Sequence, residues 1–312
     1  MRIVIIYAFN IPRYHSFVKR YFRKMPGKSK ILAIMDELDE KNLYVPLDFC
    51  AISNYNGYDN KNGGTGSLGE VIAVLSGKGG TGKTSVCAGI STALAADGCS
   101  VLAIDCDMGL QNLDISLGMS DSGALSFVDV CEGGYELSQA AQHPQFESLS
   151  FLTAPVSRTA ESVDQNAFRK MIRQAQKEFD YVLLDAPAGI DAGFELAARY
   201  AQRIILVTGA DPGAVRDASR AGQKLELMGK TNIRLVVNRV NKRLFHGMST
   251  TVDDIMDKTG LPLLGIVPED SSVLLAAAVQ VPLITYSIRG ASLALKAIAR
   301  RIQGRNVPLS MK

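Results

Sequence analysis

The feature that most constrains this chain is a glycine-rich loop at residues 77–84, which reads GKGGTGKT. The loop satisfies the pattern G-x-x-x-x-G-K-[ST], follows an apolar run at 71–75 and opens a helical pattern at 83–97. Glycines let successive backbone N–H groups turn inward, and the helix behind them contributes the positive end of its dipole. The order strand, loop, helix therefore predicts a binding site for nucleotide phosphates.

From residue 71 onward, short β-branched runs alternate with longer helical patterns. Most of the runs are almost continuously apolar, as expected for strands buried on both faces of a parallel sheet. The alternation predicts an α/β fold, a doubly wound and mainly parallel sheet flanked by helices. The strand candidates are 71–75, 101–104, 149–153, 181–184, 203–207, 233–237 and 263–267, and the longer helix candidates are 83–97, 164–178, 212–228 and 290–301.

The first seventy residues have a different character from the rest. Residues 54–69 are rich in Asn, Gly, Asp and Ser and nearly free of large aliphatic side chains, which predicts a flexible linker. We therefore expect an N-terminal extension of uncertain structure at 1–53, the linker at 54–69, the nucleotide-binding domain at 70–305 and a short tail at 306–312.

Composition limits the class and the compartment. Hydrophobic residues make up 47% and charged residues 21% of the chain, as in ordinary globular proteins. There is no apolar run of about eighteen residues and no secretory signal pattern. The five cysteines form no C-x-x-C pair and the three histidines lie far apart. We expect free thiols in a reducing cytoplasm, and neither a disulfide framework nor a metal site built from these residues.

The charge is unevenly distributed along the chain. The whole chain has a formal net charge of +3, and residues 1–30 contain eight Lys or Arg and no acid. The remaining residues therefore carry a net charge of −5. A mildly acidic body argues against nucleic-acid binding by the domain.

Several polar and charged residues occupy positions suited to binding phosphates and a metal ion. Lys83 can reach the β- and γ-phosphates, and the Thr84 hydroxyl is a Mg²⁺ ligand in loops of this type. Asp105 and Asp107 follow the second strand candidate, and Asp185 follows the fourth. In an open α/β sheet these positions share the carboxyl edge, where ligands bind.

A second lysine, Lys78, makes the loop KGGTGKT, which resembles the deviant Walker A loop of the MinD/ParA family in the SIMIBI class of P-loop NTPases. Residues 105–114 resemble the switch I pattern D-x-D-x-G-x-x-N-L-D. Residues 185–191 resemble switch II and are closer to the MinD members than to the ParA members. The likeness covers about three quarters of the chain. Members of the class that carry an iron–sulfur cluster hold it with a pair of cysteines, and the sequence has no suitably placed pair, which argues against that function.

The resemblance implies a Mg²⁺-dependent ATPase that forms a homodimer with ATP. It implies that Lys78 crosses to the partner's phosphates, that Asp107 positions the attacking water, and that Thr84, Asp105 and Asp185 hold Mg²⁺ or its water ligands. The implied nucleotide-binding residues are Gly77, Lys78, Gly79, Gly80, Thr81, Gly82, Lys83, Thr84, Ser85, Asn238, Arg239, Pro268 and Glu269, with Asn238 on the base edge and Pro268 packed on the base.

Residues 215–217 open a helix that, by the same resemblance, lies beside the dimer interface and a partner groove. An ordinary helix start with an acidic first turn is the alternative for this segment.

The cellular role implied by the family is septum-site placement in cell division, through recruitment of a MinC-like division inhibitor to the membrane, with a separate activator of hydrolysis. Two alternatives remain within the family, a regulator of flagellar number of the FlhG type and a ParA-like partition ATPase. A third belongs to another class, a scaffold that binds nucleotide without turning it over.

Family members continue into a C-terminal amphipathic helix that binds lipid, and we expect this device to be missing here because only eight residues follow Gly304. Residues 13–25 offer a substitute, since apolar side chains at i, i+3, i+4, i+7, i+8 and i+11 face away from five basic ones. Our hypothesis is a cytoplasmic protein held at the inner face of the membrane by this segment. A helix packed on the domain, or a translation start at Met35, are the alternatives.

Overall fold

The structure is a computed structural model that describes residues 68–241 and 251–309. The extension at 1–53, the membrane helix hypothesised at 13–25, residues 54–67 of the linker and the last three residues of the tail lie outside this description. The boundaries proposed for these segments stay predictions.

Eight strands form one sheet in the order β3-β4-β2-β5-β1-β6-β7-β8. Every neighbouring pair is parallel except β3 with β4, which confirms the predicted doubly wound, mainly parallel sheet. β3 was not predicted, because two residues are too short to show a pattern. The strands are β1 Glu70–Leu75, β2 Val101–Asp105, β3 Ala141–Gln142, β4 Leu149–Leu152, β5 Tyr181–Asp185, β6 Arg203–Thr208, β7 Ile233–Val240 and β8 Leu263–Pro268.

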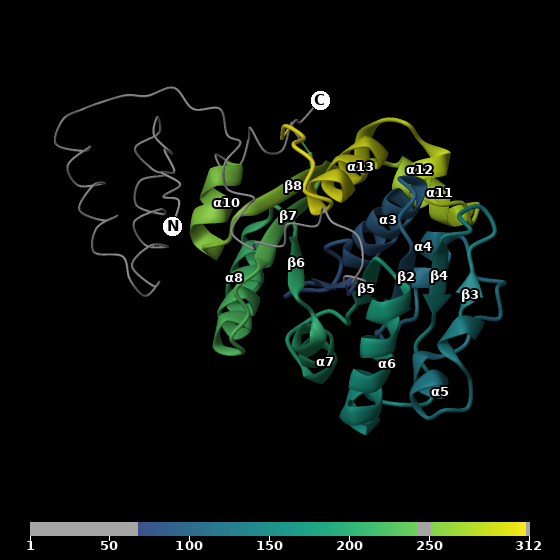
Figure 1. Cartoon of the computed structure of the whole chain (residues 1–312). Helices are drawn as coiled ribbons and strands as arrows, with labels where there is room; N and C mark the ends of the chain where they lie inside the picture. The colour runs from purple at the N-terminus through teal and green to yellow at the C-terminus, as the bar shows by residue number, and fades with distance from the viewer. Residues whose placement is uncertain (1–67, 242–250, 310–312) are drawn as a thin grey trace, which may run out of the picture. The chain divides into compact units, whose positions relative to one another are not determined.

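Helices cover both faces of the sheet, with α6, α7 and α8 on one side and α3 and α13 on the other (Figure 1). Within the described ranges, no helix is both long and apolar enough to cross a bilayer. The helices are α3 Lys83–Ala96, α4 Leu113–Leu117, α5 Phe127–Cys131, α6 Gln165–Glu178, α7 Ala192–Tyr200, α8 Pro212–Leu227, α10 Val252–Thr259, α11 Ser272–Ala278, α12 Leu283–Tyr286 and α13 Gly290–Ile302, with short 3-10 turns at Leu137–Gln139 and Ala160–Ser162.

The central strands are buried on both faces, and β1 illustrates how. Val71, Ala73 and Leu75 belong to the core beneath α6, α7 and α8. Ile72 and Val74 belong to the core beneath α3 and α13. None of these five side chains is exposed to solvent. Successive strand residues point to opposite faces, so a strand covered on both sides must be apolar throughout, as the sequence indicated.

Both ends of the domain are held by specific hydrogen bonds. The N–H of Gly69 donates to the carbonyl of Gln176 at 2.6 Å, and the Gln176 side chain donates back to Gly69 O at 3.0 Å. At the other end, Arg301 donates to the carbonyl of Leu264 in β8 and to the two carbonyls at 307–308. The residue before β1 is therefore fixed against α6, and the first residues after α13 are fixed beside β8.

A buried histidine links the turn after β3 to α4. The Nε2 atom of His143 lies 2.8 Å from Leu117 O at the end of α4. Its Nδ1 atom accepts from the backbone N–H groups of Gln145 and Phe146 at 3.0 and 3.2 Å. This set of partners requires a neutral ring with its hydrogen on Nε2. Burial lowers the pKa of His143, against the opposing effect of the Leu117 carbonyl.

We expect acidification to destabilise the fold through His143. A lowered pKa means that the unfolded chain takes up the proton first, so the stability present above the ordinary histidine pKa is lost as the pH falls below it. On lowering the pH from about 7.5 to about 5.5, the free energy of unfolding should fall less in His143→Asn than in the wild type, because the variant keeps an acceptor but does not titrate. Denaturant titrations at both pH values measure this, and equal pH dependence in the two proteins would refute it.

Candidate nucleotide-binding site

The predicted site residues converge on the carboxyl edge of the sheet. β1 leads into the loop at 77–82, Asp105 ends β2 and Asp185 ends β5. Asp105 and Asp185 are register partners on adjacent strands, and the N–H of Cys106 donates to Asp185 O at 2.8 Å. Because these strands are parallel, their ends and the loop lie side by side at the edge where open α/β folds bind ligands.

The glycines of the loop are required by its shape and by its neighbours. Gly80 and Gly82 have φ angles of 79° and 80°, in the left-handed region that favours glycine. A Cβ atom at Gly82 would collide with the amide of Asn238, and one at Gly77 would collide with the backbone of Asp217 in α8. Gly82 also caps the N-terminus of α3, so the loop passes directly into that helix.

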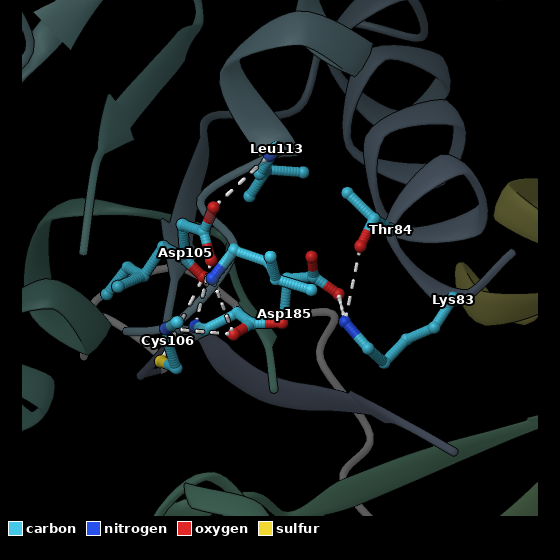
Figure 2. Close-up of polar contacts among 10 residues, drawn as sticks. Lys83, Thr84, Asp105, Cys106, Leu113 and Asp185 are labelled. Carbon is cyan, nitrogen blue, oxygen red and sulfur yellow. Dashed lines mark hydrogen bonds and ion pairs between the residues drawn. The ribbon is translucent and has the colours of Figure 1, made fainter. Parts of the chain in front are cut away.

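A buried ion pair lies beneath the loop. The Nζ atom of Lys83, in the first turn of α3, lies 2.6 Å from Oδ1 of Asp185, and Figure 2 shows the two side chains meeting between α3 and the sheet. Their side chains are only 6% and 1% exposed. Burial alone would lower the pKa of Lys83, but the attraction of Asp185, helped by Asp105, outweighs it and raises that pKa.

Asp105 adds a second buried carboxylate to this cluster. It accepts from the N–H of Asp107 at 2.9 Å and from the N–H of Leu113 at 3.2 Å. Burial and the charge of Asp185 raise the pKa of Asp105 to about 7. The pKa of Asp185 is also raised, by burial first, although Lys83 opposes the shift. Two carboxylates share one lysine, so a further cation beside the cluster would be bound favourably.

The oxygens of this cluster fit Mg²⁺. Oδ2 of Asp185 is buried and has no hydrogen-bond partner within the described residues. The hydroxyl of Thr84 lies 3.3 Å from Lys83 Nζ and points toward the same carboxylate (Figure 2). Carboxylate and hydroxyl oxygens are the ligands that Mg²⁺ prefers, directly or through water. The structure thus brings together Thr84, Asp105 and Asp185, the three residues predicted to hold the metal.

Lys78 has the opposite environment from Lys83. Its side chain is 48% exposed, and its Nζ atom lies 3.6 Å from Oδ1 of Asp211. The Asp211 carboxylate also caps α8 by accepting from the N–H of Ala214 at 2.9 Å. Sequence reasoning missed Asp211, although an aspartate before a proline at the start of a helical pattern is a recognisable helix-capping signal.

A pocket of about 330 Å³ opens beside the loop. Asn238 donates from Nδ2 to Thr81 O at 2.7 Å, and Arg239 donates to Gly80 O at 3.1 Å while lying 3.9 Å from Glu269. Arg239 has a φ of 56°, a strained value for a side-chain-bearing residue and a feature common at functional sites. The lining residues are Lys78, Gly79, Gly80, Thr81, Gly209, Ala210, Asp211, Ala214, Asn238, Arg239, Asn241 and Glu269.

Not every predicted site residue lines this pocket. Ser85 lies in the first turn of α3, and Pro268 pairs with Val240 at the end of β8. Asp107 begins a turn in which its Oδ1 atom accepts from the N–H groups of Gly109 and Leu110. The roles assigned to Asn238 and Pro268 on the base, and to Asp107 on the attacking water, stay predictions.

A phosphate loop between a strand and a helix, with acidic residues ending two adjacent parallel strands, defines a P-loop nucleotide-binding domain. A family model for the CobQ/CobB/MinD/ParA nucleotide binding domain matches residues 72–283. The chain belongs to this family.

Relatives within the family are similar over most of their length. The septum site-determining protein MinD of Bacillus subtilis (strain 168) is 39% identical over 251 residues, covering 78% of this chain and 92% of that protein. The MinC:MinD cell division protein complex of Aquifex aeolicus matches with a TM-score of 0.72 and 33% identity, covering 77% of this chain and 98% of that chain. MinD of Pyrococcus horikoshii OT3, solved with Mg-ADP, matches with a TM-score of 0.66 and 28% identity, covering 75% and 96%.

The two loop lysines should respond very differently to substitution by methionine. Lys83→Met leaves two buried carboxylates without their cation, so we expect a loss of about 3 kcal/mol in the free energy of unfolding without nucleotide. Lys78→Met removes only an exposed pair and should change that free energy by less than about 1 kcal/mol. Denaturant titration at neutral pH tests the contrast, and equal losses in the two variants would contradict it.

Proposed function

We propose that this protein is a Mg²⁺-dependent ATPase that dimerises when ATP binds and that places the division septum. The two loop lysines carry this proposal, because their environments are opposite. Lys83 is buried against Asp185, whereas Lys78 is exposed and lines the pocket. The similarity to septum site-determining relatives over most of their length supports the cellular role.

Nucleotide binding uses the loop at 77–82 and the first turn of α3. Backbone N–H groups of the loop and the N-terminus of α3 bind phosphate oxygens, and Lys83 neutralises the β- and γ-phosphates. The buried hydroxyl of Thr81 has no hydrogen-bond partner within the described residues and is available to a phosphate oxygen. Mg²⁺, when bound, supplies positive charge to the phosphate oxygens, and Thr84, Asp105 and Asp185 are the residues that hold it or its water ligands.

Turnover requires a second subunit. In the proposed dimer, Lys78 leaves Asp211 and reaches the phosphates of the partner, where its charge stabilises the transition state as an arginine finger does. The Lys78 pair is half-exposed and long, so breaking it costs little. Asp107 orients a water molecule for in-line attack on the γ-phosphate, and release of phosphate then separates the subunits.

The relatives support a cellular role in septum placement. A similar protein was solved in complex with MinC, so we propose a MinC-like division inhibitor as partner and a separate protein as activator of hydrolysis. The Mg-ADP held by the Pyrococcus horikoshii protein supports the same ligands here. The protein would act at the cytoplasmic face of the membrane, where its dimer recruits the inhibitor.

Substitutions at Lys78 and Asp107 should separate dimerisation from turnover. We expect Lys78→Ala to remain monomeric with ATP and to lose hydrolysis. Asp107→Ala should form the dimer while hydrolysing at least about 100-fold more slowly. Phosphate release and mass by light scattering measure the two steps. Hydrolysis at the wild-type rate in Asp107→Ala would reject the assigned mechanism, and a wild-type protein that binds ATP without releasing phosphate would instead be a scaffold.

Loss of the protein from its host should misplace division septa. Without a device that confines the inhibitor, septa are expected near the cell poles as well as at midcell, which microscopy of membrane-stained cells would count. Complementation with Lys83→Met, which lacks the phosphate-binding cation, should fail. Normal septa combined with altered flagellar number or with plasmid loss would point to one of the family alternatives instead.

A further inference from the structure

One lysine of α8 reaches the loop at 186–191, which joins β5 to α7. Nζ of Lys224, in the last turn of α8, donates to the carbonyl of Ile190 near the end of this loop. The same ammonium lies 2.6 Å from Oε1 of Glu195 in the first turn of α7. A single cation therefore ties the end of the loop and the start of α7 to α8.

The loop at 186–191 lies against the phosphate loop. The N–H of Gly189 donates to Ser76 O at 3.1 Å, directly before the first glycine of the phosphate loop. Ala188 faces Gly79, where an added Cβ atom would lie 3.9 Å from the Ala188 Cβ. The loop also starts directly after Asp185 of the buried ion pair. Its position is therefore coupled to the segment that is proposed to bind phosphates.

α8 contacts the phosphate loop as well. A Cβ atom at Gly77 would lie only 2.3 Å from the carbonyl oxygen of Asp217, so the backbone of α8 touches the start of the phosphate loop. Lys224 lies roughly two helical turns after Asp217, so the two residues share one side of α8. One side of this helix thus contacts both the phosphate loop and the loop at 186–191.

The first turn of α7 supports the loop from another direction. A Cβ atom at Gly193 would lie 2.3 Å from the ring of Pro187, so the helix and the loop are in close contact. Lys224 also holds this turn, through Glu195. The side chains of that ion pair are 28% and 40% exposed, so the pair itself adds little to the stability of the fold. Its main effect is on where the loop and the start of α7 lie.

We propose that Lys224 is a positioning residue for ATP hydrolysis, which holds the loop at 186–191 in place beside the phosphate loop. Lys224 does not line the pocket of about 330 Å³, so it acts through the loop and not by contact with the nucleotide. Its loss leaves the ion pair of Lys83 and Asp185 intact. The inference rests on the proposed ATPase function, and it implies slower chemistry with unchanged nucleotide affinity.

Steady-state ATP hydrolysis by the full-length protein tests the proposal, at a protein concentration where light scattering shows the wild type as a dimer. The test variant is Lys224→Met, which keeps the aliphatic stem and loses the donor. We expect kcat to fall about tenfold, with a KM for ATP within about twofold of the wild-type value, because only the loop position changes. Lys224→Arg keeps a charged donor and should retain most of the rate.

Lys230 offers a matched control. It follows α8, and its Nζ atom donates to the carbonyls of Arg199 and Ala201 at 2.8 and 3.0 Å, at the opposite end of α7. Lys230→Met therefore removes the same kind of contact at a distance from the loop, and kcat should stay at the wild-type value. Equal losses of kcat in Lys224→Met and Lys230→Met would overturn the proposal, because they would indicate general loosening of α7.

Amide hydrogen exchange adds a measurement that does not require turnover. Residues 186–195 should exchange faster in Lys224→Met than in the wild type, and Lys230→Met should leave their exchange unchanged. Unchanged exchange or an unchanged kcat in Lys224→Met would overturn the proposal.

The remaining outcomes separate positioning from its competitors. A raised KM with an unchanged kcat in Lys224→Met would assign the lysine to nucleotide binding, and a variant that stays monomeric with ATP would assign it to the dimer contact. Either result overturns the positioning role. A wild-type protein that releases no phosphate would instead reject the ATPase proposal, while faster exchange in Lys224→Met would still support the hold of this lysine on the loop.

Discussion

The contact between Lys83 and Asp185 organises the rest of the site. A lysine and an aspartate that are both almost fully buried persist only when each neutralises the other, and their 2.6 Å separation meets that condition. The contact requires the end of β5 and the first turn of α3 to face each other, which in turn requires the loop between β1 and α3 to turn tightly over glycines. Placing Asp105 on the neighbouring strand end then gives the cluster its surplus of negative charge.

The sequence predicted those elements whose physical cause is local. The strands were recognisable because burial on both faces forces continuous apolar runs, and the loop because few residues other than glycine adopt its backbone angles. The sequence could not reveal β3, which exists only through its pairing with β4. Nor could it show that Arg239 donates to Gly80 or that Asp211 meets Lys78, since each contact joins segments more than a hundred residues apart in the chain.

The two loop lysines are only five positions apart in the chain, but their different burial suits them to different tasks. The ammonium of Lys83 is fixed in a dry, acidic environment, so it acts as a permanent part of its own subunit's site. The ammonium of Lys78 is half-exposed and paired with an equally accessible aspartate, an interaction that water and salt weaken. A side chain held so loosely can exchange Asp211 for a phosphate of another subunit, which Lys83 could not do without exposing two buried carboxylates.

Three consecutive residues connect the wall of the nucleotide pocket to α11 and α13. Pro268 ends β8, Glu269 lines the pocket and faces Arg239, and Asp270 binds the starts of α11 and α13. Because Asp270 fixes both helix starts, α11 and α13 have a defined position relative to the wall of the nucleotide pocket.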